Sequence, residues 1–325
     1  MWYAGERMKV VYGHTDSIYV KIPDLVGETF IEHTRIELND HVRSKFPNLL
    51  GLKEHPINIE WEKLYETLGV GLTKNRNAGL INWKDGEKLE EPEFVMTGFT
   101  AKRMSITPLE KEVQLKILRM WVEKKPKEEI DAYCNTMWNK VAKGNIDLDQ
   151  ICKRSRYRSE RFKAKCSCGK EYSFKKLLEI HKSVEDKRQS IGFKKASLIQ
   201  PICNKCGNRL SKFTTIKDKR ITIGSGIEGV LNYNNHHTHN ITDSYVYIKT
   251  KANEGGNYFH PLTGNIIRSS WLSAPSIKEL LGVKPDWLHY ANTIVKKAEP
   301  IYNAMGWTTT EISRDISQKT LDEWW

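Results

Sequence analysis

Two cysteine pairs have the residue types and spacing that predict chemistry in this sequence. Cys166 and Cys168 stand two positions apart, Cys203 and Cys206 stand three apart, and a glycine follows each pair. A glycine there lets the backbone turn back tightly, and four thiolates complete the tetrahedral shell of a structural Zn²⁺ ion. We therefore predict a zinc-ribbon-like module. His181 is an alternative ligand, although its helical pattern favours exposure to solvent, and four free thiols are a further alternative.

A second chemical feature is Asp16, which stands in the stretch KVVYGHTDSIY near the start of the sequence. β-Branched and aromatic residues on both sides of a short polar turn predict an antiparallel hairpin. Carboxylates on rigid strands hold the paired divalent cations of nucleotidyl transfer, and one carboxylate cannot hold two such ions. As a metal ligand, Asp16 therefore needs a second carboxylate from elsewhere. The alternative is an ordinary turn-forming aspartate.

Positive charge is concentrated in one segment of the 325 residues. From Lys153 to Arg220 there are 21 Lys and Arg and 6 Asp and Glu, whereas the whole chain has a net charge of +12. Charge of this kind predicts a nucleic-acid contact surface, and a merely solvated basic face is the alternative. The sequence contains no run of about 18 apolar residues, so we predict no membrane span. It also has no apolar segment near residue 1, so we predict no secretory signal. We expect a cytoplasmic, nucleoid-associated protein without a membrane partner.

The hydrophobic spacing predicts the elements that position these residues. Residues 28–46 and 108–124 have the pattern of amphipathic helices, the second with an apolar stripe of Leu109, Val113, Ile117 and Met120. Further helices are expected to end at Gly144 and to span about residues 286–305. Strands are expected over residues 57–73, 77–83, 226–234 and 243–249.

The run VVYGHTDSIYVKI resembles motif C of the family B DNA polymerases, whose usual form is Tyr-Gly-Asp-Thr-Asp-Ser. The resemblance implies that Asp16 is a catalytic palm ligand for Mg²⁺. The other motif positions are Tyr12, Gly13, His14, Thr15 and Ser17. Because the family normally has an Asp at the position of His14, this departure weakens the expectation of activity.

The resemblance continues along the chain in the family's order. The family's Lys-Lys-Arg-Tyr motif, which tracks primer–template DNA, corresponds to residues 74–77. Residues 96–114 are similar to the entry into the thumb, residues 147–164 to the next thumb helix, and residues 285–307 to the last. The residues that the resemblance implies as DNA contacts are Lys74, Arg76, Lys102, Arg103, Arg154, Arg156 and Arg158.

Other parts of the family are absent from this sequence, namely the Asp-x-x-Ser-Leu-Tyr-Pro motif of the other palm carboxylate, the fingers helix and the exonuclease region. The resemblance therefore implies the C-terminal part of a split polymerase, with a large partner subunit supplying the other palm Asp and the fingers. The expected fold class is α+β, a partial antiparallel palm followed by a mainly helical thumb. Its expected parts are the palm over residues 1–106, thumb helices over 107–160, a zinc-binding basic insertion over 161–220, the rest of the thumb over 221–310 and a tail over 311–325.

The tail predicts a protein-binding peptide. Gln318, Leu321, Trp324 and Trp325 follow a spacing that resembles the PCNA-interacting peptide. A single helical turn would place Leu321 and both Trp rings on one side as an apolar plug. The alternative is burial of both Trp rings in the chain's own core.

The resemblances taken together imply the small subunit of a heteromeric DNA-directed DNA polymerase of archaeal type. It would add dNTP units to primer–template DNA with Mg²⁺, be tethered to a sliding clamp, and be inactive alone. The alternative is a catalytically degenerate fragment that acts as a DNA- and clamp-binding scaffold, which His14, Asn75 and Asn77 favour. A zinc-ribbon DNA-binding factor unrelated to synthesis is a third, more distant alternative.

Overall fold

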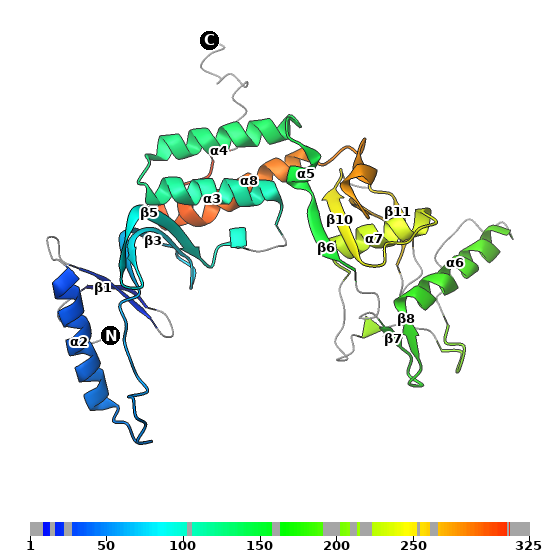
Figure 1. Cartoon of the computed structure of the whole chain (residues 1–325). Helices are drawn as coiled ribbons and strands as arrows, with labels where there is room; N and C mark the ends of the chain where they lie inside the picture. Colours follow the sequence, from blue (N-terminus) through cyan, green and yellow to red (C-terminus); the bar gives the residue numbers. More distant parts are fainter. Residues whose placement is uncertain are drawn as a thin grey trace, which may run out of the picture. The chain divides into compact units, whose positions relative to one another are not determined.

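The computed structural model describes residues 9–13, 17–22, 28–102, 106–157, 163–190, 202–208, 213–214, 223–251, 254–260, 266–310 and 312. The chain divides into two compact units (Figure 1). The first unit comprises Met1–Lys102, Gln114–Cys134 and Ala298–Glu311. The second comprises Arg103–Val113, Asn135–Lys297 and Ile312–Trp325. No helix among the described residues is long and apolar enough to cross a lipid bilayer.

The first unit begins with a two-stranded hairpin and a helix. Strand β1 (Lys9–Gly13) pairs antiparallel with β2 (Ile18–Lys21), and helix α2 (Glu28–Lys45) follows. A three-stranded antiparallel sheet comes next, in the order β3 (Lys63–Val70), β4 (Asn77–Lys84) and β5 (Glu87–Thr97). The short 3₁₀ helix η1 (Thr100–Lys102) ends this part. These elements confirm the predicted hairpin, helix and strands, although the expected strand over residues 57–73 begins only at Lys63.

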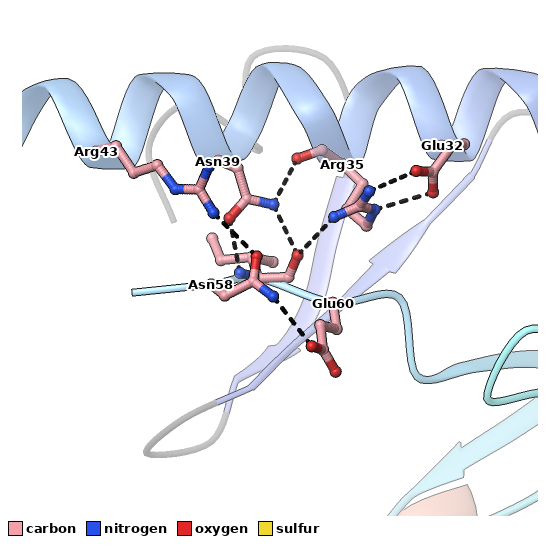
Figure 2. A network of polar contacts seen from close by, with 7 residues as sticks. Glu32, Arg35, Asn39, Arg43, Asn58 and Glu60 are labelled. Atoms are coloured by element: carbon pink, nitrogen blue, oxygen red, sulfur yellow. Dashed lines mark hydrogen bonds and ion pairs between the residues drawn. The ribbon is translucent and has the colours of Figure 1, made fainter. Parts of the chain in front are cut away.

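Helix α2 is tied to the extended segment before β3 by polar side chains (Figure 2). The buried Asn39 amide donates to the Ile59 carbonyl at 2.7 Å, and its oxygen accepts from the Ile59 N–H at 2.7 Å. Asn39 thus bonds this segment as a neighbouring strand would. Arg43 Nε donates to the Ile57 carbonyl at 3.3 Å, and Arg35 bonds Ile59 more weakly at 3.5 Å. Figure 2 also shows the contacts of Glu32, Asn58 and Glu60.

Three long helices follow the sequence pattern closely. Helix α3 (Pro108–Val122) buries its predicted apolar stripe, whose members are at most 8% exposed. Helix α4 (Lys127–Ala142) ends before Gly144, which has a left-handed φ of 73°, and α8 spans Trp287–Met305. In the first unit, β3 lies close to α3, because a Cβ at Gly69 would come within 2.5 Å of the Trp121 ring.

The second unit contains a small sheet with helices around it. Helix α5 (Leu148–Ile151) leads into β6 (Lys153–Arg156), which pairs with β10 (Ser244–Lys249), and β10 also pairs with β13 (Trp271–Ala274). Helix α7 (Ser225–His236) packs on β13. The second unit also contains a hairpin, in which β11 (Asn257–Phe259) pairs with β12 (Ile266–Arg268). It contains the 3₁₀ helix η3 (Ile277–Leu280) as well. A second sheet has the order β8 (Glu171–Ser173), β7 (Lys163–Lys165), β9 (Phe213–Thr214), with helix α6 (Phe174–Ser190) after β8.

Two sequence predictions about this unit are wrong. Residues 147–164 do not form one thumb helix, because the helical turn ends at Ile151 and the next four residues pair with β10 as strand β6. Residues 226–234 do not form the expected strand, because they belong to helix α7. The two glycines there are packing positions. A Cβ at Gly229 would lie 2.3 Å from Ser273 Oγ, and one at Gly226 would lie 2.5 Å from the Tyr245 hydroxyl.

Candidate functional site

The β1–β2 hairpin is joined to the turn between β3 and β4 by a tyrosine. The backbone N–H of Asn75 donates a 2.9 Å hydrogen bond to the hydroxyl of Tyr12. Tyr12 lies in β1, one residue before the strand ends. Tyr12 also approaches the Asn75 side-chain oxygen at 3.5 Å, the long limit of such a bond. Gly13 ends β1 and Ser17 directly precedes β2. The metal-ligand candidate Asp16 and its neighbours His14 and Thr15 lie outside the described residues.

The turn of residues 74–77 has a fixed backbone. Asn75 adopts a left-handed conformation with φ of 63°, which Asn tolerates better than most residues with a side chain. The Gly71 N–H closes the turn on the Arg76 carbonyl at 2.8 Å. Gly98, at φ 74°, lies so close that a Cβ there would come 1.7 Å from the Asn75 carbonyl oxygen. This close packing presents Lys74 as an exposed side chain and Arg76 as a half-buried one.

A second contact between hairpin and sheet involves Asn77, which is 3% exposed and begins β4. Its amide approaches the Tyr19 hydroxyl of β2 at 3.5 Å. The Tyr19 ring lies 5.8 Å from that of Tyr65 on β3, and burial raises the pKa of Tyr65 well above its usual range. Both residues that depart from the family's Lys-Lys-Arg-Tyr motif, Asn75 and Asn77, therefore contact tyrosines of the hairpin.

The predicted thumb cations are only partly described. Arg154 and Arg156 stand two apart on β6, so their side chains leave the same face of the strand, and both are exposed. Neither makes a hydrogen bond or ion pair with the residues that the structure describes, which leaves both free to meet phosphates. Arg103 and Arg158 lie outside the described residues, as does the side chain of Lys102.

A buried acidic residue holds β6 and α8 to the start of α3. Glu110 is 6% exposed and forms a reciprocal cap with Thr107, whose N–H donates to the Glu110 carboxylate at 2.9 Å. Lys153 lies 3.6 Å and Lys297 3.3 Å from the two carboxylate oxygens. Burial raises the pKa of Glu110, but the Thr107 N–H and the two lysines together bring it below its ordinary value. Sequence reasoning missed this cluster, although the Thr-x-x-Glu spacing signals the cap.

The four cysteines of the predicted metal site converge. Their Sγ atoms all lie within 4.8 Å of one another, with Cys166 and Cys206 at 3.4 Å and Cys168 and Cys203 at 3.7 Å. A tetrahedral Zn²⁺ with Zn–S bonds of about 2.3 Å separates its sulfurs by about 3.8 Å, so the donor set fits that ion. His181 contributes nothing to this cluster that can be described, because its side chain lies outside the described ones.

Each cysteine pair stands in a tight backbone turn. The Gly169 N–H bonds the Cys166 carbonyl at 2.9 Å, and the Gly207 N–H bonds the Cys203 carbonyl at 2.8 Å. Both glycines have left-handed φ values, 84° and 75°, which confirms that each turn needs a residue without a side chain. The two turns thus present two pairs of thiols to one point.

Tyr172 on β8 supports the cysteine cluster from the protein interior. Its hydroxyl has two acceptors for its one proton, Cys203 Sγ at 3.2 Å and Asn204 Oδ1 at 2.5 Å, and it accepts from the Asn204 N–H at 2.9 Å. The hydrogen bond from Tyr172 lowers the pKa of the Cys203 thiol to about 6, which favours the thiolate that binds metals. Sequence reasoning missed the role of Tyr172, since no spacing rule joins it to Cys203.

The cysteine cluster is continuous with the core of the second unit. Cys166, Tyr172 and Cys203 belong to one buried apolar cluster with Leu231 of α7 and Tyr245 of β10. Other members of this cluster are Tyr157, Leu177, Val230, Ile241 and Tyr258. The cysteine-bearing segment therefore shares its interior with α7 and β10. The remaining predicted residues, Gln318, Leu321, Trp324 and Trp325, lie outside the described residues.

Comparison with known proteins assigns the family. The sequence model of DNA polymerase family B matches residues 3–303. The DNA polymerase zeta catalytic subunit of Schizosaccharomyces pombe is 25% identical over 155 residues, which are 48% of this chain and 10% of that protein. The DNA polymerase zeta catalytic subunit of Saccharomyces cerevisiae is 27% identical over 160 residues, 47% of this chain and 10% of the relative. The DNA polymerase delta catalytic subunit of Candida albicans is 28% identical over 157 residues, 48% of this chain and 14% of the relative.

The chain thus spans only a small part, 10% to 14%, of the length of these relatives. The family match, in contrast, covers most of the chain, from the motif C hairpin to helix α8. The chain therefore belongs to DNA polymerase family B.

Proposed function

We propose that this chain supplies the motif C hairpin and the thumb of a DNA-directed DNA polymerase. The observation that carries the proposal is the 2.9 Å bond between Tyr12 and Asn75. It joins the hairpin that bears residue 16 to the turn that bears Lys74 and Arg76. A polymerase needs this arrangement, because the metal ligand and the groups that grip primer–template DNA must keep one fixed relation.

In this proposal Asp16 is one of two palm carboxylates for Mg²⁺, which would stabilise the charge that develops as a primer 3′-hydroxyl attacks a dNTP. Lys74 and Arg76 contact DNA phosphates, and Lys102 and Arg103 are further phosphate contacts in this proposal. Arg154 and Arg156, exposed on one face of β6, also contact phosphates, with Arg158 in the same run. Such contacts are salt-dependent and largely independent of base sequence.

The second palm carboxylate and the fingers come, in this proposal, from a large partner subunit, so the chain alone is inactive. Exposed apolar side chains of the first unit support a partner there. Val11 of β1 and Ile36 of α2 are 46% and 47% exposed, and Leu49 and Leu50 after α2 are 88% and 80% exposed. A polypeptide that covers these side chains would remove their apolar surface from water.

The four cysteines hold a structural Zn²⁺ in this proposal. Their convergence and the fit of the donor set support it. The basic segment around the site extends the contact of the thumb with duplex DNA, in a nucleoid-associated cytoplasmic setting of archaeal type. The tail residues Gln318, Leu321, Trp324 and Trp325 bind a sliding clamp, which raises the local concentration of the enzyme at DNA.

A degenerate scaffold that binds DNA and the clamp without synthesis is the competing proposal, and His14 is the residue that favours it. Asn75 and Asn77 weigh less in its favour than their departure from the motif suggests. Each contacts a hairpin tyrosine, so their presence has a structural reason within a polymerase.

Primer extension distinguishes the two proposals. The chain is mixed with a family B polypeptide that carries the other palm carboxylate and the fingers, and extension of a labelled primer is measured with Mg²⁺ and dNTPs. We expect extension in the mixture alone, and its loss with Asp16→Ala. Asp40→Ala, exposed on helix α2, is the matched control and should extend normally. Extension that survives Asp16→Ala, or a mixture that binds DNA but never extends it, contradicts the polymerase proposal.

A further inference from the structure

The second unit contains a cavity of about 220 Å³ that has no role in the polymerase site proposed above. Its described lining comes from helices α6 and α7, the loop of residues 240–242 and Tyr157 directly after β6. Its floor is apolar, formed by Tyr157, Leu231 and Ile241, all at most 7% exposed. These three residues belong to the same buried cluster as Cys166 and Cys203. The cavity therefore exists because the basic, cysteine-bearing segment packs on α7.

The wall of the cavity is preformed. The Asn234 side chain accepts from the Ile241 N–H at 2.7 Å and approaches the Ile241 carbonyl at 3.4 Å, which fixes the loop after α7. Lys182 Nζ of α6 donates to the Asn234 carbonyl at 3.3 Å, across the cavity edge. The Tyr157 N–H bonds the Asp243 carbonyl at 2.7 Å and holds the floor to the same loop. A ligand would therefore enter a site that needs little ordering.

Polar groups without partners surround this apolar floor. The side chains of Lys175, Asn235 and Asn240 make no hydrogen bond or ion pair with other residues that the structure describes, and all three line the cavity. The one acidic residue in the described lining, Glu179, is paired with Lys176 at 3.0 Å. The rim is therefore positive, with two carboxamides that can each donate and accept.

We propose that this cavity binds one unpaired nucleotide of a DNA strand. The apolar floor receives the base, the Asn235 and Asn240 amides bond its polar edge, and Lys175 and Lys182 contact the adjacent phosphates. The size favours a single base, since the cavity is smaller than the roughly 300–1,000 Å³ pockets that enclose a drug-sized molecule. A base within a duplex must first be unpaired and unstacked to enter the site, so duplex DNA should fill it less readily than a single strand.

A fluorescent oligo-dT and a fluorescent duplex of equal length test this site by anisotropy titration of the full chain. The test variant is Lys175→Ala with Asn235→Leu. We expect it to weaken oligo-dT binding at least about tenfold and duplex binding less than about twofold. The matched control is Lys251→Ala, because Lys251 is an exposed lysine of the second unit that does not line the cavity. Equal losses for both DNAs, or equal effects of the test variant and the Lys251 change, overturn the proposal.

Two further measurements keep the result independent of folding and of the polymerase proposal. An oligonucleotide with 5-iodouracil should crosslink to Tyr157 in the wild-type chain, and crosslinks found only elsewhere contradict the site. Competition by dTMP as strong as that by oligo-dT would assign a free nucleotide as the ligand and overturn the strand assignment. Neither measurement needs Mg²⁺, dNTP or Asp16, so loss of extension activity and loss of this site are separate outcomes.

Discussion

The hydroxyl of Tyr12 accepts a hydrogen bond from the backbone of Asn75, 63 positions later in the sequence. The bond requires the left-handed backbone of Asn75, and Gly98 allows that backbone to lie where it does. One turn therefore bonds the hairpin and also displays two cations. A change in the backbone of this turn should therefore affect both the bond to the hairpin and the positions of the two cations.

Asn75 tests this coupling directly. Asn75→Gly keeps the left-handed backbone, and we expect the free energy of unfolding to change by less than about 0.5 kcal/mol. Asn75→Val places a β-branched residue at positive φ and should cost about 1–3 kcal/mol. Urea denaturation of the two variants beside the wild-type chain measures the difference. Equal stabilities of the two variants would contradict a strained backbone at this turn.

Glu110 should make stability depend on pH. Glu110→Gln leaves Lys153 and Lys297 without a buried anion, and we expect a loss of about 1–3 kcal/mol at pH 7. The folded pKa of Glu110 is lowered, so its contribution is complete above about pH 4.3. It disappears as the pH falls through the lower folded pKa, because the unfolded state then binds the proton more strongly.

Denaturation of wild type and Glu110→Gln at neutral and acid pH measures this contribution, and the two curves should converge in acid. Glu112→Gln, exposed on the same helix, is the control and should change stability by less than about 0.5 kcal/mol. A gap between the curves that stays constant down to strongly acid pH is inconsistent with this role.

Metal analysis of the purified chain should find about one zinc ion per chain, and a chelator should lower the melting temperature. Cys203→Ser with Cys206→Ser should remove the ion. Cys134→Ser is the control, because burial raises the pKa of Cys134 to about 12 and keeps it a thiol inside α4. That variant should lose stability and keep its metal. Zinc content that is unchanged in the double variant would exclude the site.

Tyr172 should tune the affinity of the same site. Tyr172→Phe removes the hydrogen bond to Cys203 Sγ and should weaken zinc binding about 10- to 100-fold, measured by competition with a chromophoric chelator. Tyr258→Phe is the control, because Tyr258 lies in the same buried cluster and forms no hydrogen bond among the described residues. If both variants bind zinc equally well, the hydroxyl of Tyr172 has no role at the metal.

The tail should bind a clamp independently of the rest of the chain. Removal of residues 318–325 should abolish pull-down with a PCNA-type ring and leave clamp-free primer extension by the reconstituted complex unchanged. Thr320→Ala is the control, because position 320 is not part of the Gln-x-x-aliphatic-x-x-aromatic-aromatic spacing. Retention of the ring by the truncated chain would refute a clamp-binding tail.

Local patterns predicted those parts of the fold that local physics decides. The apolar stripe of α3, the hairpin around residue 16 and the end of α4 at Gly144 all follow from side-chain periodicity and turn residues. The cysteine spacing predicted a cluster, and the four Sγ atoms do converge. Whether that cluster holds zinc, and whether Asp16 binds magnesium, stay predictions.

Tertiary packing determines the parts of the fold that the sequence patterns predicted wrongly or missed. In α7, Gly226 and Gly229 look like turn residues, but they are glycines because Tyr245 and Ser273 leave no room for a side chain. The charged residues of β6 lack the alternating pattern of a strand, and they form one because they pair with β10. The Glu110 cluster joins residues from three distant segments, so no spacing in the sequence announces it.

The apolar interior shared by Cys166, Tyr172, Leu231 and Tyr245 has a consequence for how this chain can be engineered. Four of the ten buried residues in this cluster come from residues 163–208 and six come from outside, so the segment cannot be excised or transplanted as a cassette. A version of the chain trimmed to resemble its relatives would have to repack α7 and β10, and a graft of residues 163–208 into another protein would carry an unfinished core.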